Sequence, residues 1–305
     1  HTRLQGDWSS DVCSSDLTYQ LIHDWFGKSS NLDVDVHWFD GHTEADFSAA
    51  FEKVSRDCKE RLKDGKQIYV YIESPCNPHG YVLDVPAICR AAHQHDITVI
   101  CDATIGTPFL YPVLQQEDPL DRPDYVVHSY TKDLVGTGTA TAGVVIGKNE
   151  TMFIPKHTSA DIKSPTGTTK KIEWHDTLFW NVYYIKGSFL DSEKAFEVLN
   201  GMRSLEMRML KKCINTIVLS RVLNEHPLLT VHCSAVKDNS NYNLAQRLLY
   251  LGLPAPLFTI DFEKARQNSG LSLQTFKSFF DQLEPVFGLQ VSLGQINTIV
   301  LCPAL

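Results

Sequence analysis

Short apolar runs alternate with amphipathic stretches along the first half of the chain. Runs rich in β-branched and aromatic residues, which are typical of strands, occur at 34–39, 67–74, 97–102, 125–129 and 142–147. Between them, helical periodicity occurs at 47–62, which Thr43 can cap and Gly65 can end, and at 85–95, after Asp84. Strands and helices in this order predict an α/β fold with a mostly parallel sheet, covered by helices on both faces.

The pattern changes after Lys148. The stretch 148–187 has no clear periodicity and is interpreted as a loop followed by an aromatic-rich segment. A long helical stretch at 192–224, interrupted or bent at Gly201, precedes two expected strands, at 257–262 and 289–293, with a helix at 272–283 between them. We therefore expect a large domain at 18–195 and a smaller, incomplete α+β domain at 196–305.

The first 17 residues stand apart from both expected domains. Residues 9–17 read SSDVCSSDL, a near-duplication that shows neither helical nor strand periodicity. We interpret the segment 1–17 as a non-native remnant of cloning or sequencing, with a natural flexible arm as the alternative. No function is assigned to it.

Composition narrows the class of protein. The 305 residues are 43% hydrophobic, enough for a substantial core, and the net charge of −8 argues against a nucleic-acid partner. The chain has no apolar run of about 18 residues and no signal-peptide pattern at its start, so we expect a cytoplasmic protein with no membrane partner. The eight cysteines are scattered without a C-x-x-C pair, which predicts reduced thiols and no metal site.

Three polar clusters directly follow expected strands, at 73–77, 102–104 and 128–132. Ligands of open α/β sheets bind outside the carboxyl ends of the strands, so we expect one crevice to collect these clusters. Ser129 and Thr131 alternate on an extended segment and, with Gly136 and Gly138 after them, can form a phosphate cradle beside the amine of Lys132. A Ser/Thr turn is the alternative.

Asp102 ends an apolar strand. Its carboxylate is therefore partly desolvated and needs a cationic or hydrogen-bonding partner. A protonated pyridine nitrogen would be such a partner, and capping of the next turn is the alternative.

Together, the motifs resemble the Cys/Met-metabolism family of pyridoxal 5′-phosphate (PLP) enzymes, which includes cystathionine γ-synthase, cystathionine γ-lyase and methionine γ-lyase. The motifs are ESPCNPHGYVLDVPAICRAAH at 73–93, VICDATIGTPFL at 99–110 and VVHSYTKDLVGTGTATAGVVIG at 126–147. The resemblance covers about Thr18 to Ala304. It implies PLP as cofactor, the fold type I of PLP-dependent transferases, a small amino-acid substrate and a homodimer or homotetramer.

The resemblance also implies individual roles. Lys132 would hold PLP as a Schiff base, and Asp102 would pair with the pyridine nitrogen. The remaining implied contacts are to the phosphate (Ser129, Thr131), the phenolic oxygen (Asn77), the ring (Thr104) and the substrate carboxylate (Ser292, in Ser-Leu-Gly).

The chain also departs from the family pattern. Ser-Asp-Leu at 15–17 replaces a Tyr-Gly-Gly whose tyrosine stacks on the cofactor, Gly-Thr-Gly-Thr at 136–139 replaces Gly-His-x-Asp, and 148–171 matches poorly. The tyrosine and arginine that a neighbouring subunit lends to the phosphate, and the arginine that binds the substrate carboxylate, would lie beyond the two ends of the chain. We therefore expect a chain truncated at both ends.

These implied roles favour an enzyme of sulfur amino-acid metabolism in which Lys132 acts as general base on the substrate Cα. We favour γ-replacement on an activated homoserine, as in cystathionine γ-synthase, with γ- or β-elimination as the alternative. Val291 resembles the methionine γ-lyase pattern rather than the glutamate common in the other enzymes. An aminotransferase and a non-catalytic fragment are more distant alternatives.

Other polar residues are assigned no chemistry. His93 and His95 point to different faces of a helix, so we expect solvated histidines rather than metal ligands. Cys76 and Cys101 are expected to be buried spectators, and His128 a packed strand residue.

Overall fold

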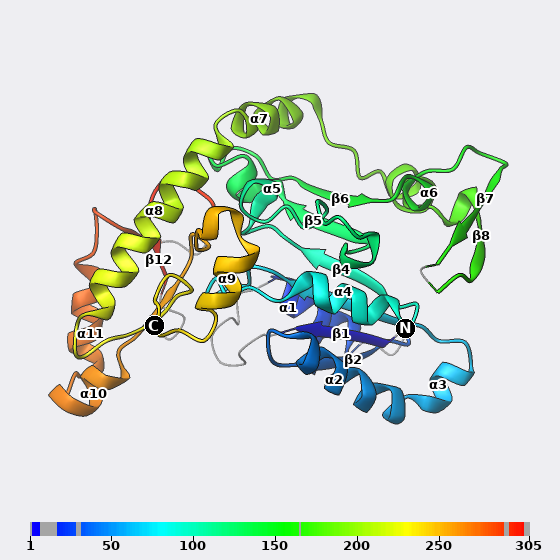
Figure 1. Cartoon of the computed structure of the whole chain (residues 1–305). Coiled ribbons are helices and arrows are strands. Elements are labelled where there is room, and N and C mark those ends of the chain that lie inside the picture. Colours follow the sequence, from blue (N-terminus) through cyan, green and yellow to red (C-terminus); the bar gives the residue numbers. More distant parts are fainter. Residues whose placement is uncertain (1, 7–16, 29–31, 165, 290–292, 302–305) are drawn as a thin grey trace.

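The computed structural model describes residues 2–6, 17–28, 32–164, 166–289 and 293–301. Its centre is a six-stranded sheet with the order β2-β1-β3-β4-β5-β6 (Figure 1). Neighbouring strands are parallel except for β6, which runs antiparallel to β5, so the predicted mostly parallel sheet is confirmed. The strands are β1 (Thr2–Gly6), β2 (Asp35–Phe39), β3 (Ile68–Glu73), β4 (Thr98–Asp102), β5 (Tyr125–Ser129) and β6 (Gly143–Gly147).

Strand β1 was not expected. It lies between β2 and β3 and pairs with both, although it comes from the segment 1–17 that we assigned no structure. Residues 7–16, which contain most of the near-duplicated stretch, lie outside the described residues. The interpretation of 1–17 as a remnant stays a prediction, but Thr2–Gly6 has a structural place in the sheet.

The helices of the first half begin where the sequence predicts. Thr43 caps α2 (Glu44–Asp57) with a capping box that it shares with Asp46. The expected continuous helix instead breaks at Cys58, after which α3 (Lys59–Lys63) follows. The other helices and helical turns of this half are α1 (Leu17–Gln20), η1 (Leu21–Phe26), α4 (Val85–His93), α5 (Thr107–Leu110), η2 (Pro119–Asp121), η3 (Tyr130–Leu134) and α6 (Asn149–Met152).

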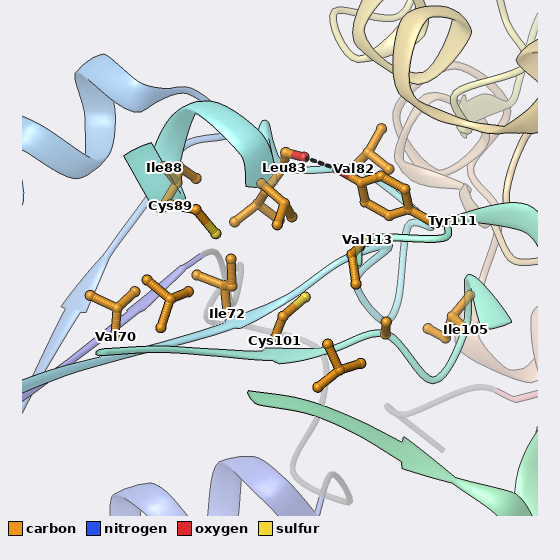
Figure 2. Packing of buried hydrophobic residues seen from close by; sticks show 14 of the residues in the cluster. Val70, Ile72, Val82, Leu83, Ile88, Cys89, Cys101, Ile105, Tyr111 and Val113 are labelled. Carbon is orange, nitrogen blue, oxygen red and sulfur yellow. Dashed lines mark hydrogen bonds between the residues drawn. The ribbon is translucent and has the colours of Figure 1, made fainter. Parts of the chain in front are cut away.

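One face of the sheet packs into the main hydrophobic core. Side chains alternate along a strand, so Val70 and Ile72 of β3 and Cys101 of β4 point to the same side, toward Ile88 and Cys89 of α4 (Figure 2). All five side chains are completely buried. The opposite face therefore receives the alternate residues of β3 and β4, and these carry the polar groups of the site.

The stretch 148–187 is not the loop that we expected. It contains an antiparallel hairpin of β7 (Ser159–Lys163) and β8 (Thr169–Glu173), which Figure 1 shows at the end of the molecule away from α8. Apolar periodicity could not reveal this hairpin, because its side chains are mostly exposed and polar. Two helical turns follow, η4 (Trp174–Asp176) and η5 (Phe179–Tyr184).

The expected long helix is two helices, α7 (Ser192–Met202) and α8 (Leu205–Asn224). Gly201 lies inside α7 and does not bend it. A Cβ at this position would lie 2.3 Å from the backbone oxygen of Val135, so glycine allows the helix to approach the segment after Lys132 closely.

Short elements make up the C-terminal part. The expected strand at 257–262 is confined to its centre, where β10 pairs antiparallel with β9, and most of the expected strand at 289–293 lies outside the described residues. Leu205, Met209 and Ala245 belong to the same core cluster as the sheet. The elements are β9 (Thr230–His232), α9 (Tyr242–Leu248), η6 (Tyr250–Gly252), β10 (Thr259–Asp261), α10 (Glu263–Ser269), α11 (Leu273–Asp281), β11 (Gly288–Leu289) and β12 (Ile299–Val300).

Two further expectations concern membranes and thiols. None of the helices in the described part of the chain is both long and apolar enough to cross a bilayer. The six cysteines within the described ranges are buried and are not paired in disulfides with one another.

Candidate functional site

The three polar clusters follow adjacent parallel strands. β3 ends at Glu73, which lies opposite Asp102 at the end of β4, and β5 ends at Ser129. Backbone hydrogen bonds continue past the strand ends, because Ser74 N–H donates to the Asp102 carbonyl (3.0 Å) and Ala103 N–H donates to the Val127 carbonyl (3.1 Å). The sheet therefore brings the clusters together at one edge, as the sequence predicts.

Asp102 is held by two hydrogen-bond donors. The Tyr71 hydroxyl donates to Oδ2 at 3.1 Å, and the backbone N–H of Thr104 donates to Oδ1 at 2.9 Å. Burial, together with the charges of Asp102 and Glu73, raises the pKa of Tyr71 well above its ordinary value, so the phenol keeps its proton and remains a donor. Each carboxylate oxygen still has acceptor capacity for another group.

Thr104 connects Asp102 to the third cluster. Its hydroxyl oxygen accepts a hydrogen bond from the backbone N–H of Ser129 at 2.9 Å. The Ser129 hydroxyl itself has no hydrogen-bond partner within the described ranges, so it can donate to an incoming anion. Thr104 therefore positions Ser129 next to the segment that carries Asp102.

Thr131 has a structural contact that the sequence did not predict. Its hydroxyl donates to the Ala142 carbonyl at 3.2 Å and accepts from the Ala142 N–H at 3.0 Å. These bonds tie the turn after β5 to the segment before β6. A phosphate contact by Thr131 stays a prediction, and it would require the hydroxyl proton to leave Ala142.

Lys132 lies in a tight turn, η3, where its φ of −86° and ψ of −133° are not helical. Gly294 approaches it from far along the chain, with a φ of +92°. A Cβ on Gly294 would lie 2.5 Å from the Cα and carbonyl carbon of Lys132, so only glycine fits there.

Helix α8 contacts the same turn from another side. Lys212 Nζ forms an ion pair with Asp133 Oδ1 at 2.5 Å, and Arg208 Nη1 donates to the Asp133 carbonyl at 2.7 Å. Asp133 is only 3% exposed, so its charge depends on Lys212 for compensation. The backbone that carries Lys132 is thus fixed by charged groups of α8 and by Gly294.

The structure shows less about the two remaining predicted residues, Asn77 and Ser292. The backbone N–H of Asn77 donates to Glu73 Oε1 at 3.0 Å, which anchors Asn77 at the end of β3. Ser292 lies outside the described residues, although its neighbours Leu293 and Gly294 pack on the core and on Lys132. The roles of Asn77 and Ser292 stay predictions.

The expectation of a solvated His93 is wrong. His93 is 4% exposed, and its ring nitrogens contact the Leu120 carbonyl (2.8 Å) and Asp124 Oδ2 (3.1 Å). Helical spacing could not show this, because both partners come from a later loop. His95 is exposed, as expected, and its ring lies 4.5 Å from that of Phe51.

The three expected spectators are buried. His128 is 3% exposed, and burial lowers its pKa. Cys76 and Cys101 are also buried, and burial raises the pKa of Cys101, so its thiol stays protonated and unreactive.

Sequence reasoning missed Tyr71, Lys212 and Gly294. Tyr71 had a usable signal, because it lies two positions before Glu73 and so shares a face of the sheet with it. Gly294 belongs to the Ser-Leu-Gly motif, but its contact with Lys132 is long-range. Lys212 had no local signal.

Comparison with known proteins places the chain among PLP-dependent enzymes. A family model described as Cys/Met metabolism PLP-dependent enzyme matches residues 10–305. The chain is 31% identical to an L-methionine gamma-lyase of Treponema denticola over 81% of its length, and 25% identical to an O-acetyl-L-homoserine sulfhydrylase of Leptospira meyeri over 96%. These matches cover 53% and 64% of the two relatives, so the chain spans about half to two thirds of their length.

A solved structure agrees with the fold. The structure of a cystathionine gamma synthase from Xanthomonas oryzae matches with a TM-score of 0.72 at 19% identity, covering 99% of this chain and 64% of the other. This similarity supports the predicted fold type I.

Proposed function

Because the chain belongs to the Cys/Met metabolism family of PLP-dependent enzymes, we propose that it is the larger part of an enzyme that cleaves the Cγ–S bond of a sulfur amino acid. The family depends on PLP, which confirms the cofactor prediction. The sequence alone favoured γ-replacement. The methionine gamma-lyase among its relatives, together with Val291, supports γ-elimination as the first choice.

The residues at the strand ends fit PLP. Asp102 is an acceptor fixed by Tyr71 and Thr104, with capacity left for a protonated pyridine nitrogen. Ser129 offers an unused hydroxyl donor for the phosphate, and Lys132 supplies the amine. Asn77 and Thr104 would lie beside the ring, and Ser292 would hold the substrate carboxylate.

PLP, when bound, supplies an electron sink for the charge that develops at the substrate Cα. The protein's own groups would do the rest. Lys132 Nζ would take the Cα proton as general base, while the Asp102 carboxylate would accept a hydrogen bond from the protonated ring nitrogen. Tyr71 would hold the Asp102 carboxylate in one orientation.

The observation that carries this proposal is the Asp102 carboxylate, which accepts from Tyr71 and from the same Thr104 that positions Ser129. Structural anchors alone would not require a partly buried carboxylate that keeps acceptor capacity and lies beside a hydroxyl with no hydrogen-bond partner among the described residues. The arrangement is therefore better suited to a bound cationic ring with an anionic substituent.

The first experiment tests cofactor attachment. The purified chain is incubated with PLP, reduced with borohydride and digested, and the labelled peptide is identified by mass. We expect label on Lys132, loss of label in Lys132→Ala, and unchanged labelling in Lys163→Ala, which alters an exposed lysine of β7. Label on another lysine would contradict the proposal, and no label in any variant would favour a non-catalytic fragment.

The second experiment distinguishes γ-elimination from γ-replacement. Methionine and cystathionine are tested for release of 2-oxobutyrate, and an acylhomoserine with cysteine is tested for cystathionine. Release of 2-oxobutyrate supports γ-elimination, whereas cystathionine formation supports γ-replacement, for which the O-acetyl-L-homoserine sulfhydrylase relative is an argument. Amino-group exchange with a 2-oxo acid, without release of thiol, would indicate an aminotransferase.

Self-association is part of the proposal. Phe196 and Leu199 of α7 and Val218 and Val222 of α8 are apolar side chains that are more than half exposed, and a second subunit could cover them. A homodimer or homotetramer would give a mass by light scattering of two or four chains. A cytoplasmic location is also proposed, and it is tested by cell fractionation.

A further inference from the structure

Three possible metal ligands meet at the edge of the sheet. Asp35 and His37 lie two residues apart on β2, so both side chains point to the same face, and Cys58 follows the end of α2. One ligand atom from each residue lies within 4.8 Å of the other two. Across the described ranges, no other trio of histidine, cysteine or acidic residues comes this close.

The spacing suits a single tetrahedral ion. Zinc binds cysteine sulfur at about 2.3 Å and histidine nitrogen at about 2.0–2.1 Å, so tetrahedral angles separate these two atoms by roughly 3.5 Å. The distance from Cys58 Sγ to His37 Nε2 is 3.4 Å. The pair therefore already stands at the separation that a shared ion requires.

The chemical types of the three ligand atoms determine which metal ion the site prefers. A thiolate and an imidazole favour zinc and ions of similar preference, whereas magnesium and calcium take mainly oxygen ligands. Cys58 is 6% exposed, while Asp35 and His37 are partly exposed. The three residues line a surface hollow of about 520 Å³, which leaves room for water or another small ligand at the fourth position.

Arg61 is the competing partner. Its Nε lies 2.9 Å from Asp35 Oδ2, and its Nη2 lies 2.9 Å from Asp33 Oδ1. A carboxylate has two oxygens, so Asp35 can keep Arg61 on Oδ2 and offer Oδ1 to an ion. Asp33 continues to balance the charge of Arg61, and the guanidinium then orients the ligating carboxylate.

We propose that Asp35, His37 and Cys58 form a binding site for one divalent ion of the zinc class, with a fourth position open to solvent. The thiol of Cys58 loses its proton to solvent on binding. The site lies apart from Ser129 and Lys132, because β2 and β5 are separated by four strand spacings, roughly 19 Å. It is therefore independent of the proposed enzymatic function.

The test uses the full, tag-free chain with two probes. Zinc is titrated in competition with a coloured chelator, and cobalt(II) is added to detect the near-ultraviolet band of a thiolate–cobalt bond. We expect one equivalent of zinc per chain and a cobalt band. Cys58→Ser should abolish the band, and His37→Ala should weaken zinc binding at least about 100-fold.

Cys213→Ser is the matched control, because Cys213 is equally buried and has no such ligand set around it in the described structure. Far-ultraviolet circular dichroism of each variant shows that it is folded, and His37→Ala, at a partly exposed position, tests the site without altering a buried residue. Zinc binding that survives both ligand substitutions, or a cobalt spectrum without the thiolate band, would overturn the site. Labelling of Lys132 by PLP is expected to be unchanged in either case.

Discussion

Lys212 of α8 forms an ion pair with Asp133, the residue next to Lys132, with 2.5 Å between Nζ and Oδ1. Asp133 is buried, and Arg208 binds its carbonyl oxygen from the same helix. Two cationic side chains of α8 thus fix the backbone of Lys132, the proposed cofactor lysine, from outside the site.

Lys212→Met should therefore lower the stability of the protein. Removing one partner leaves the buried Asp133 carboxylate without its counter-charge, which we expect to lower the free energy of unfolding by about 3 kcal/mol and to reduce PLP labelling of Lys132. The double variant Lys212→Met with Asp133→Asn should recover part of the stability, because no buried charge remains. Urea unfolding measures both, and a double variant less stable than Lys212→Met would contradict the pairing.

Gly294→Ala should disturb the turn that carries Lys132 through a steric clash. The new Cβ would lie 2.5 Å from the Lys132 backbone, and the residue has a positive φ, so we expect a loss of about 3 kcal/mol or more. Gly167→Ala is the matched control, since its φ is +90° and, among the described residues beyond its chain neighbours, no atom lies within 4 Å of the added Cβ. It should cost only about 1 kcal/mol. Equal losses in the two variants, measured by thermal unfolding, would argue against close packing at Gly294.

Tyr71→Phe should weaken cofactor binding. It removes one of the two donors to Asp102, and we expect the Kd for PLP to rise roughly tenfold, or about 1.4 kcal/mol. Tyr69→Phe, two residues earlier on β3, is the control, because its hydroxyl donates to the exposed Gln67 rather than to Asp102. Titration with PLP, followed by absorbance, compares the two. A similar Kd for both variants would show that the phenol does not act on Asp102.

The buried His93–Asp124 pair predicts a dependence of stability on pH. Burial opposes the charge on His93, but the hydrogen bond and the negative charge of Asp124, together with the hydrogen bond to the Leu120 carbonyl, outweigh it and raise the pKa of His93 above 6.5. Burial likewise opposes the charge on Asp124, but bonds from His93 and Val99 hold its pKa below 3.8. The His93 contribution is complete below pH 6.5 and is lost as pH rises through its folded pKa, while the Asp124 contribution is lost in acid.

The variant Asp124→Asn tests the direction in which the stabilisation by the His93–Asp124 pair changes with pH. The difference in unfolding free energy between the original chain and the variant should be larger at pH 5.5 than at pH 8, where His93 has lost more of its charge. Urea unfolding at the two pH values gives the comparison. A difference that is equal at both pH values, or larger at pH 8, would contradict the charged pair.

The sequence predicts the parts of this molecule that local patterns determine. Apolar runs followed by polar residues were enough to place Asp102 and Ser129 at neighbouring strand ends, because parallel strands end at one edge of a sheet. Contacts such as Gly294 with Lys132 join residues far apart in sequence, and no period or motif encodes them. The hairpin of β7 and β8 was missed for a related reason, since an exposed polar ribbon has no apolar alternation to detect.

The contact between Gly294 and Lys132 also sets an order of events during synthesis. The ribosome completes β5 and the turn that carries Lys132, the proposed cofactor lysine, long before it adds Gly294. Until that late segment emerges and docks, one side of the turn is uncovered, and such long-range closures are slow steps of folding. The nascent chain therefore cannot present its lysine in the final setting, and firm capture of the cofactor belongs after translation rather than during it.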